Sequence, residues 1–277
     1  MENNLELIFS QFNTGCHLLE CGRYGSGHIH ETYKIETEGS ENFNYILQKL
    51  NRNIFRDIPS LQSNIERVTS HIRNKLSKTG VSDIDRRTLS LIKTCEGHLW
   101  YKEENGDCWR MYKFISDHRS YDIVDTPGKA YQGGRGIGRF QAQLADLPLP
   151  QLNETIPFFH DIENRLETFW QTVTNDPAGR VETAKNEINF VKDREEVMKT
   201  IKSLGSQGVI PLRITHNDTK FNNILLDSDD NALCVIDLDT VMPGYVHYDF
   251  GDAIRTAANS AAEDETDLGL VYMDIEL

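Results

Sequence analysis

Short runs of alternating apolar and polar residues, separated by glycine-rich or acidic turns, fill the first part of the chain. Such runs predict strands, and their spacing predicts an antiparallel sheet of about five or six strands. One different pattern interrupts them, because Leu61, Ile65, Val68, Ile72 and Leu76 recur every three or four positions and predict one amphipathic helix. The strand-like runs lie at 16–24, 29–36, 43–50, 89–94, 98–102 and 108–115.

From residue 117 onward the pattern is mostly helical. It predicts helices at 127–145, 160–174 and 181–204, followed by short strands at 212–215 and 232–237. We therefore expect an α+β fold with two lobes, joined by a short crossing. The predicted β-rich lobe spans residues 1–115 and the predicted helical lobe spans residues 116–277. Clefts between lobes are favoured ligand sites, so we expect the functional site near the crossing.

Composition narrows the class of partner and the compartment. The 29 Lys and Arg against 43 Asp and Glu leave a formal charge of −14, which argues against nucleic acid or an anionic membrane as partner. Five cysteines without a C-x-x-C pair argue against a disulfide framework or a structural zinc site. The sequence shows neither a signal-peptide pattern nor a run near the roughly 20 apolar residues of a spanning helix. We expect a soluble, cytoplasmic protein, and the oligomeric state stays open.

The densest group of chemically capable residues is the stretch HNDTKFNN at 216–223. An apolar run, an Asp- and Asn-rich turn at 227–231 and a second apolar run follow it, which predicts a β-hairpin. In that hairpin Asn223 lies opposite Ile236, one residue from Asp237. An amide oxygen and a carboxylate brought together in this way suit Mg²⁺, which also takes phosphate oxygens.

Asp218 precedes this hairpin on a loop, where it is free to act as a base. One carboxylate that receives a hydroxyl proton, with an Asn and a second Asp that hold Mg²⁺ on nucleotide phosphates, is the set that phosphoryl transfer requires. We expect the acidic turn at 227–231 to be purely structural. We expect His216 to hold the loop through backbone hydrogen bonds.

Glycines form two further patterns. Gly22, Gly25 and Gly27 lie between two strand-like runs, where backbone N–H groups could approach phosphates, although a plain hairpin turn explains them too. The stretch GGRGIG at 133–138 superficially suggests a dinucleotide-binding loop, but no strand precedes it. We expect it to lie in the helix at 127–145 and to pack tightly against a neighbour.

Two stretches resemble a known family. THNDTKFNNILLD at 215–227 and ALCVIDLDTVMPGYVHYDFGDAIR at 232–255 are similar to motifs of the aminoglycoside phosphotransferase and choline kinase family, and most similar to the N-acetylhexosamine 1-kinases. Looser similarity extends over about residues 20–260. The resemblance implies a protein-kinase-like fold. It also implies transfer of the γ-phosphate of ATP, with Mg²⁺, to the anomeric hydroxyl of N-acetylglucosamine or N-acetylgalactosamine as the small-molecule substrate.

The resemblance also implies roles for residues of this chain. On the chemical side, Asp218 matches the catalytic Asp, while Asn223 and Asp237 match the Mg²⁺ ligands. Asp239 is the less favoured ligand, because it lies two residues further along the strand. We expect Asp249 to brace the loop by pairing with Arg255. The residues expected to contact the sugar are Asp218, Thr219 and His28, with His30 as the alternative to His28.

On the nucleotide side, the resemblance places the phosphates at Gly25 and Gly27. A lysine on the third strand should pair with a glutamate on the following helix and touch the phosphates, and the candidates are Lys49 and Glu66. If YILQ is aligned with the usual motif, Gln48 takes the lysine position and Lys49 faces the other way. The backbone around Phe114 and Ile115 is expected to hold adenine.

Three alternatives stay open. The same fold could act on an aminoglycoside, choline or another amino-alcohol instead of a sugar. A glycosyltransferase could use Asp237 and Asp239 as a D-x-D metal site, but this would leave HNDTKFNN unexplained. Finally, the family continues with further helices beyond GDAIR, so the C-terminal lobe is expected to be incomplete. In that case we expect little activity or weak sugar binding.

Overall fold

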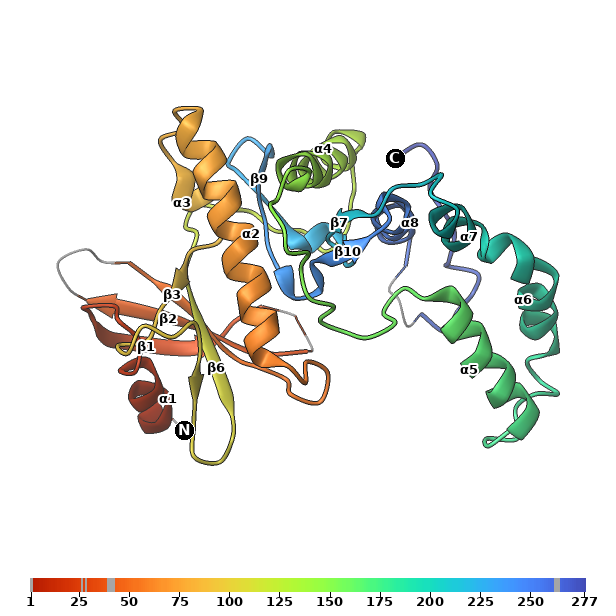
Figure 1. The fold of residues 1–277 in the computed structure, drawn as a ribbon, viewed down its shortest axis with the longest axis horizontal. Helices are drawn as coiled ribbons and strands as arrows, with labels where there is room; N and C mark the ends of the chain where they lie inside the picture. The colour runs from red at the N-terminus through yellow and green to blue at the C-terminus, as the bar shows by residue number, and fades with distance from the viewer. Residues whose placement is uncertain (1, 26, 28, 39–42, 262–264) are drawn as a thin grey trace.

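The structure is a computed structural model, and it describes residues 2–25, 27, 29–38, 43–261 and 265–277. Its N-terminal part is built on an antiparallel sheet with the strand order β1-β2-β3-β6-β4, and β5 pairs with β6 (Figure 1). Every predicted strand of this part is present. The strands are β1 (His17–Arg23), β2 (Glu31–Glu38), β3 (Tyr45–Lys49), β4 (Leu91–Ile92), β5 (Tyr101–Lys102) and β6 (Cys108–Lys113).

The predicted amphipathic helix is α2 (Ile58–Lys78), which lies beside the sheet on the side of the C-terminal part (Figure 1). It begins at Asp57, whose carboxylate accepts the backbone N–H of Ser60 at 3.0 Å. Its apolar stripe is buried in the larger hydrophobic core, which also contains the hairpin strands of the C-terminal part. The helix therefore joins the two parts of the chain. The sequence did not predict α1 (Glu2–Phe9) or the short α3 (Ile84–Arg87).

The C-terminal part is mostly helical, as predicted, with two short strand pairs and two 3-10 turns among the helices of the described residues. The predicted helix at 181–204 is two helices, because the chain turns at Lys199. The helices are α4 (Pro127–Leu144), α5 (Ile162–Asn175), α6 (Lys185–Met198), α7 (Thr200–Ser206) and α8 (Val246–Ala257). The strands are β7 (Arg213–Thr215), β8 (Ile224–Leu226), β9 (Ala232–Val235) and β10 (Met242–Gly244), and the 3-10 turns are η1 (Phe221–Asn223) and η2 (Leu238–Thr240).

The glycine-rich stretch lies inside α4 and lets this helix approach the hairpin of β8 and β9. A Cβ atom on Gly133 would lie 3.0 Å from the ring of Phe221, and one on Gly136 would lie 3.1 Å from Ile224. Both contacts are closer than side chains normally allow. The prediction of a tightly packed helix is thus confirmed, and its neighbour is the hairpin that carries Asn223.

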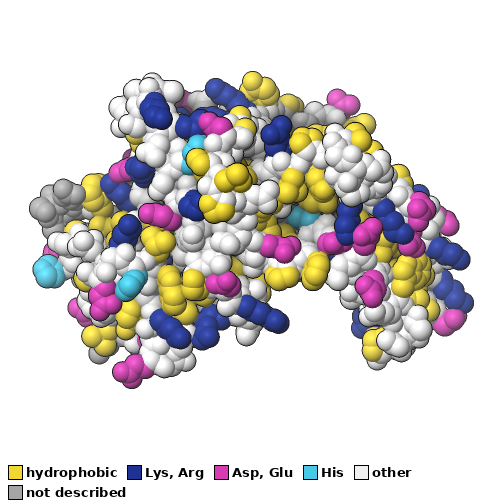
Figure 2. All heavy atoms as spheres, viewed as in Figure 1, with side chains coloured by type: hydrophobic (Ala, Val, Ile, Leu, Met, Phe, Trp, Pro, Cys, Tyr) yellow, Lys and Arg dark blue, Asp and Glu magenta, His cyan; other side chains and the backbone are white. Residues whose placement is uncertain are grey.

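Helices α5, α6 and α7 extend away from the sheet, and Figure 2 shows the molecule hollowed between them and the N-terminal part. Leu166 of α5 is the single buried residue in these three helices, all of which lie in the described ranges, so they contribute little to the core. None of the helices in the described ranges combines the length and the apolar character that crossing a bilayer requires. The α+β fold with an antiparallel N-terminal sheet and a helical C-terminal part is confirmed, while the boundary at residue 115 stays a prediction.

Candidate functional site

The hairpin of β8 and β9 has the predicted register at its functional end. Ile224 lies opposite Val235 and Leu225 opposite Cys234. The backbone N–H of Ile236 donates to the carbonyl of Asn223 at 2.9 Å, which continues the same register. A bulge at Leu226 changes the pairing only next to the turn. The hairpin therefore brings Asn223 beside the segment that carries Asp237.

His216 holds the loop in front of this hairpin, as predicted. Its Nδ1 accepts the backbone N–H of Asp218 at 3.3 Å, and its Nε2 lies 2.9 Å from the carbonyl oxygen of Ile236. A ring that accepts through Nδ1 and donates through Nε2 is a neutral imidazole with its proton on Nε2. His216 is fully buried. It therefore ties the loop of Asp218 to the segment of Asp237.

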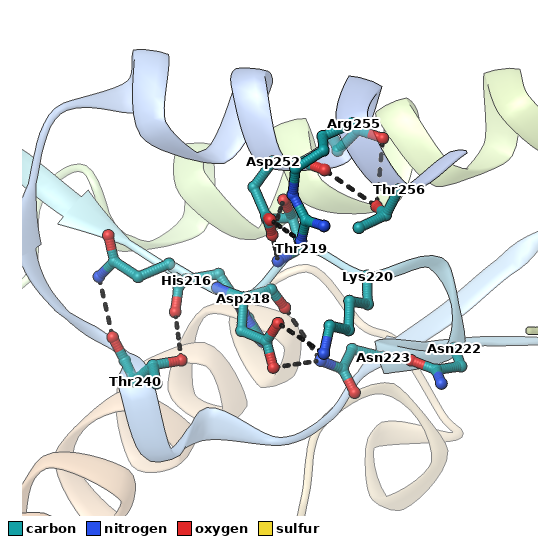
Figure 3. A network of polar contacts seen from close by, with 12 residues as sticks. His216, Asp218, Thr219, Lys220, Asn222, Asn223, Thr240, Asp252, Arg255 and Thr256 are labelled. Carbon is teal, nitrogen blue, oxygen red and sulfur yellow. Dashed lines mark hydrogen bonds and ion pairs between the residues drawn. The ribbon is translucent and has the colours of Figure 1, made fainter. Parts of the chain in front are cut away.

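Two carboxylates of α8 support the same loop from the other side. Asp249 accepts the backbone N–H groups of His216 and Asn217 at 2.9 and 2.7 Å. Asp252 accepts the N–H of Thr219 at 2.6 Å, and Figure 3 shows this contact above the loop. The expected pairing of Asp249 with Arg255 is wrong, because Arg255 lies about one turn beyond Asp252 and binds that residue at 2.8 Å.

Asp218, Asn223 and Lys220 point toward one another in Figure 3. The side-chain amide of Asn223 donates to the backbone carbonyl of Asp218 at 2.9 Å and to its carboxylate at 3.3 Å. Since the NH₂ group is used in this way, the amide oxygen of Asn223 is turned away from Asp218. Lys220 Nζ lies 3.9 Å from the carboxylate of Asp218, which stays partly accessible, with 22% of its side chain exposed.

Two cavities open around these residues. The first, of about 560 Å³, lies between the sheet and the hairpin, and the second, of about 550 Å³, lies between the hairpin and the end of α8. Asn223 and Asp237 line both cavities, whereas Asp218 lines only the second. The arrangement places an amide and a carboxylate at the junction of two chambers and a possible base in one of them.

The first cavity contains most of the residues predicted to bind the nucleotide. Gly25, Gly27, Phe114 and Ile115 all line it. The backbone N–H groups of Lys113 and Phe114 donate within the sheet, to Ser90 and Asn44, so they are not available to a ligand. The predicted sugar contact His28 lies outside the described residues.

The predicted ion pair between Lys49 and Glu66 is wrong. Lys49 Nζ binds Asp107 at 2.6 Å, and Glu66 lies 3.7 Å from Lys93. Successive residues of β3 point to opposite faces of the sheet, and the residue that faces the cavities is Gln48. The alternative alignment, with Gln48 in the lysine position, therefore describes the geometry.

Thr219 does not lie where a contact with the sugar requires it to be. Only 2% of the residue is exposed, and its hydroxyl donates to the backbone carbonyl of Asp249 at 2.8 Å. The reason is the course of the loop, which turns the side chain after Asp218 toward α8 (Figure 3). Thr219 is a loop-positioning residue in this structure, and the prediction of a sugar contact is corrected accordingly.

Asp239 is buried and fully occupied by partners that the sequence did not reveal. Arg110 of β6 contacts both of its carboxylate oxygens, with Nη2 at 2.7 Å from Oδ2, and His30 Nε2 lies 2.7 Å from Oδ2. Burial alone would raise the pKa of Asp239, but the charge and hydrogen bonds of Arg110 and the hydrogen bond of His30 hold it well below its usual range. Asp239 is therefore an anchored carboxylate and has little capacity left for a metal ion.

Asp237 has the opposite character. Its carboxyl faces the cavities, where the residue stays exposed to solvent. The protein around it and the negative charges of Asp239 and Asp218 raise its pKa to about 7. Within the described residues, no group of three His, Cys, Asp or Glu side chains could hold a metal ion. One carboxylate and one amide oxygen at a junction instead fit Mg²⁺, which keeps waters and shares phosphate oxygens. The residues that would hold it are Asn223 and Asp237.

Comparisons with known proteins show the family and the fold of the chain. The sequence profile described as the phosphotransferase enzyme family matches residues 20–271. A spectinomycin phosphotransferase solved with ADP and spectinomycin is 16% identical with a TM-score of 0.54, over 88% of this chain and 69% of that one. An amicoumacin kinase solved with AMP-PNP and Ca²⁺ is 12% identical with a TM-score of 0.57, over 92% and 69%. A microcompartment-associated aminopropanol kinase is 13% identical with a TM-score of 0.50, over 92% and 74%.

Proposed function

Because the chain belongs to the phosphotransferase enzyme family, we propose that it transfers the γ-phosphate of ATP, with Mg²⁺, to the anomeric hydroxyl of an N-acetylhexosamine. The observation that carries this proposal is the pair of cavities that meet at Asn223 and Asp237, with Asp218 in only one of them. A nucleotide in the first cavity would present its terminal phosphate at the junction. An acceptor hydroxyl in the second would meet that phosphate beside Asp218.

In this arrangement Asp218 receives the proton of the acceptor hydroxyl as its oxygen attacks the γ-phosphorus. The new bond joins the sugar oxygen to that phosphorus, the bond from the γ-phosphorus to the bridging oxygen breaks, and ADP leaves. Asn223 keeps the Asp218 carboxylate oriented through its NH₂ group. A bound Mg²⁺ would supply neutralisation of the phosphate oxygens.

The lining of the second cavity supports a neutral, hydroxyl-rich acceptor. Of its three carboxylates, Asp218 and Asp237 are used in the chemistry, and Asp122 accepts a hydrogen bond from Asn222 at 2.9 Å. The two cations Lys220 and Arg255 would disfavour a positively charged acceptor near the base. Apart from His30, which binds Asp239, the remaining polar groups are neutral amides and hydroxyls, which suit the hydroxyl and acetamido groups of an N-acetyl sugar. They are Thr32, Gln48, Asn222, Asn223, Thr256, Asn259 and Ser260.

A second candidate is the same phosphoryl transfer to an amino-alcohol or an aminoglycoside. Two observations favour it: the similar structures include a spectinomycin phosphotransferase and an aminopropanol kinase, and Asp122 offers a carboxylate on the wall of the second cavity. The two candidates share the nucleotide, the metal ligands and the base. They differ only in the charge of the acceptor.

An acceptor screen with ATP and Mg²⁺ separates them. We expect ADP release with N-acetylglucosamine or N-acetylgalactosamine, and none with their 1-O-methyl glycosides, which lack the anomeric hydroxyl. Choline, aminopropanol and kanamycin serve as cationic acceptors in the same assay. Turnover only on a cationic alcohol would overturn the sugar proposal in favour of the second candidate, and phosphorylation of the methyl glycosides would exclude the anomeric position.

The raised pKa of Asp237 predicts pH-dependent binding of the Mg²⁺ complex of ADP. A carboxyl whose pKa is about 7 in the folded chain, above its ordinary value, binds more protons folded than unfolded, so its contribution to the unfolding free energy falls as the pH rises from about 4 to 7. A cation binds the Asp237 carboxylate only after the carboxyl group has lost its proton. Below pH 7 the cation therefore competes with that proton. Because Asp237 is also exposed to solvent, which screens the neighbouring charges, we expect binding to be a few-fold tighter at pH 8 than at pH 6, on the order of threefold.

Isothermal titration calorimetry at the two pH values measures this difference. The nucleotide's own terminal phosphate also titrates in this range, so the same pair of titrations on Asp237→Asn supplies the correction. If the pH dependence of the variant equals that of the unchanged protein, the titrating group is not Asp237.

A further inference from the structure

Asp237 is held in place by the turn that follows it and by the partners of Asp239. Asp237 begins the η2 turn in a left-handed conformation, with φ at 56°. A single turn of this kind sets the direction of the Asp237 side chain, so the position of the turn decides whether the carboxylate reaches the junction of the cavities. The residue that anchors the turn is Asp239, two positions on, of which only 2% is exposed.

Asp239 is anchored from the sheet of the N-terminal part. Arg110 lies on β6 and His30 at the start of β2, and both bind the Asp239 carboxylate. The Nδ1 atom of His30 accepts the backbone N–H of Asn51 at 3.0 Å, so Nε2 carries the proton and donates it to Asp239. A neutral histidine therefore suffices, and Arg110 is the cation of this group.

Arg110 is also tied to the strand position where kinases carry a lysine. Gln48 of β3 lies directly opposite Arg110, and its amide oxygen accepts from Arg110 Nε at 2.9 Å. Its amide nitrogen donates to Thr32 at 3.0 Å. In protein kinases a lysine at this position pairs with a helix glutamate, and the pair must form before the site is active. In this chain the lysine position is taken by the neutral amide of Gln48, and the positive charge is that of Arg110 on the neighbouring strand β6.

We propose that Arg110 is a positioning residue: held by Gln48, it fixes Asp239 and thereby sets Asp237 at the nucleotide, in place of the lysine–glutamate pair of other kinases. The link joins the sheet that covers the first cavity to the turn that carries the metal ligand. This proposal rests on the proposed function in one respect, that Asp237 binds the Mg²⁺ ion of the nucleotide. It does not depend on which acceptor is phosphorylated.

The energetics of buried ion pairs agree with a positioning role. Taking two charges out of water costs about as much as their attraction returns, so a buried pair adds little net stability over an apolar pair of similar size. What it adds is one defined geometry, since the planar guanidinium contacts both oxygens of a carboxylate at once. Removing only one partner leaves an unpaired buried charge and is strongly destabilising.

The test is therefore a double variant, Arg110→Met with Asp239→Asn, which removes both charges and leaves His30 an acceptor oxygen. ADP binding is measured by calorimetry in the presence of Mg²⁺ and again in EDTA. We expect a Tm within a few degrees of the unchanged protein and a loss of about 10–100-fold in ADP affinity with Mg²⁺, the usual cost of removing a partner that orients a metal ligand. Arg110 also lines the first cavity, but its guanidinium is bound to Gln48 and Asp239. The affinity in EDTA is therefore expected to change less than about threefold, below the cost of disturbing a metal ligand.

The control is Arg23→Met with Glu31→Gln, which removes an exposed ion pair of the same sheet, 2.8 Å long, and the same charges. It should leave both affinities unchanged. If Mg²⁺ increases the ADP affinity of the Arg110 and Asp239 double variant as much as that of the unchanged protein, the proposal is overturned. An equal loss in EDTA would also overturn it, since Arg110 would then be a direct nucleotide contact.

A double variant without a cooperative thermal transition would make the link a requirement for folding, and this too would overturn a positioning role. If the unchanged protein shows no Mg²⁺-dependent ADP binding, Asp237 does not bind a nucleotide-bound Mg²⁺ ion. The proposed function and this proposal would then fail together. Failure of the sugar screen alone would not affect any of these results, because ADP binding involves no acceptor.

Discussion

Replacing Asp218 with Asn is expected to lower kcat by about 10²–10⁴-fold, the usual contribution of a positioned base. The amide keeps the size of the side chain but cannot take the proton of the acceptor hydroxyl. The contact to the Asn223 amide is a weak one at 3.3 Å, and the backbone carbonyl of Asp218 still accepts from Asn223 at 2.9 Å. We therefore expect ADP affinity with Mg²⁺ and the KM for the acceptor to change little.

The matched control is Asp122→Asn, which removes another carboxylate of the same cavity, one that accepts a hydrogen bond from Asn222 at 2.9 Å and not from Asn223. Its kcat should stay within a few-fold of the unchanged enzyme. Steady-state kinetics on both variants give the comparison. Wild-type turnover by Asp218→Asn would exclude Asp218 as the base, and an equal loss in both variants would indicate a general effect of cavity charge.

Replacing Asp249 with Asn is expected to destabilise the protein by about 3 kcal/mol, the order of magnitude for losing hydrogen bonds to a buried charged group. Asp249 is buried and accepts two backbone N–H groups of the loop, one on each carboxylate oxygen, with a third bond from Gln141 at 2.6 Å. An Asn has only one oxygen, so its NH₂ group would face one of these N–H donors. The loop that carries Asp218 should loosen, and kcat should fall with the stability.

Thermal and urea unfolding of Asp249→Asn measure the effect, with Asp193→Asn on the exposed face of α6 as the control for charge. We expect the control to unfold like the unchanged protein. A variant at Asp249 that unfolds at the same urea midpoint would show that the two backbone contacts do not hold the loop.

The three residues predicted to carry the chemistry lie within one short stretch, and the structure has the hairpin register from which they were predicted. Asp218, Asn223 and Asp237 belong to a loop and a hairpin whose register follows from alternation and from one acidic turn. Because the contacts that join them are local, no knowledge of the remaining chain is needed. The same holds for His216, whose backbone partners are two and twenty residues away.

On the nucleotide side, local sequence patterns do not show which residue faces the cavities. Lys49 and Gln48 are neighbours on one strand, and a shift of one residue exchanges the faces on which they lie. The alternation in YILQK alone does not choose between them. Pairing with β2 and β6 decides it, since Gln48 then lies between Thr32 and Arg110. Thr219 is a similar case, because its direction depends on where α8 packs.

The fold class, the order of most elements and the hairpin beside Asp218, Asn223 and Asp237 follow from the amino-acid sequence, because hydrophobic periodicity and turn residues act over short distances. Long-range packing was needed to show which strand residue faces the cavities, how α8 supports the loop, and that Asp239 is held by Arg110 and His30. The partners of Asp239, Arg110 and His30, are 129 and 209 residues away along the chain. Their contact arises from the packing of the sheet against the hairpin, and no local pattern encodes it.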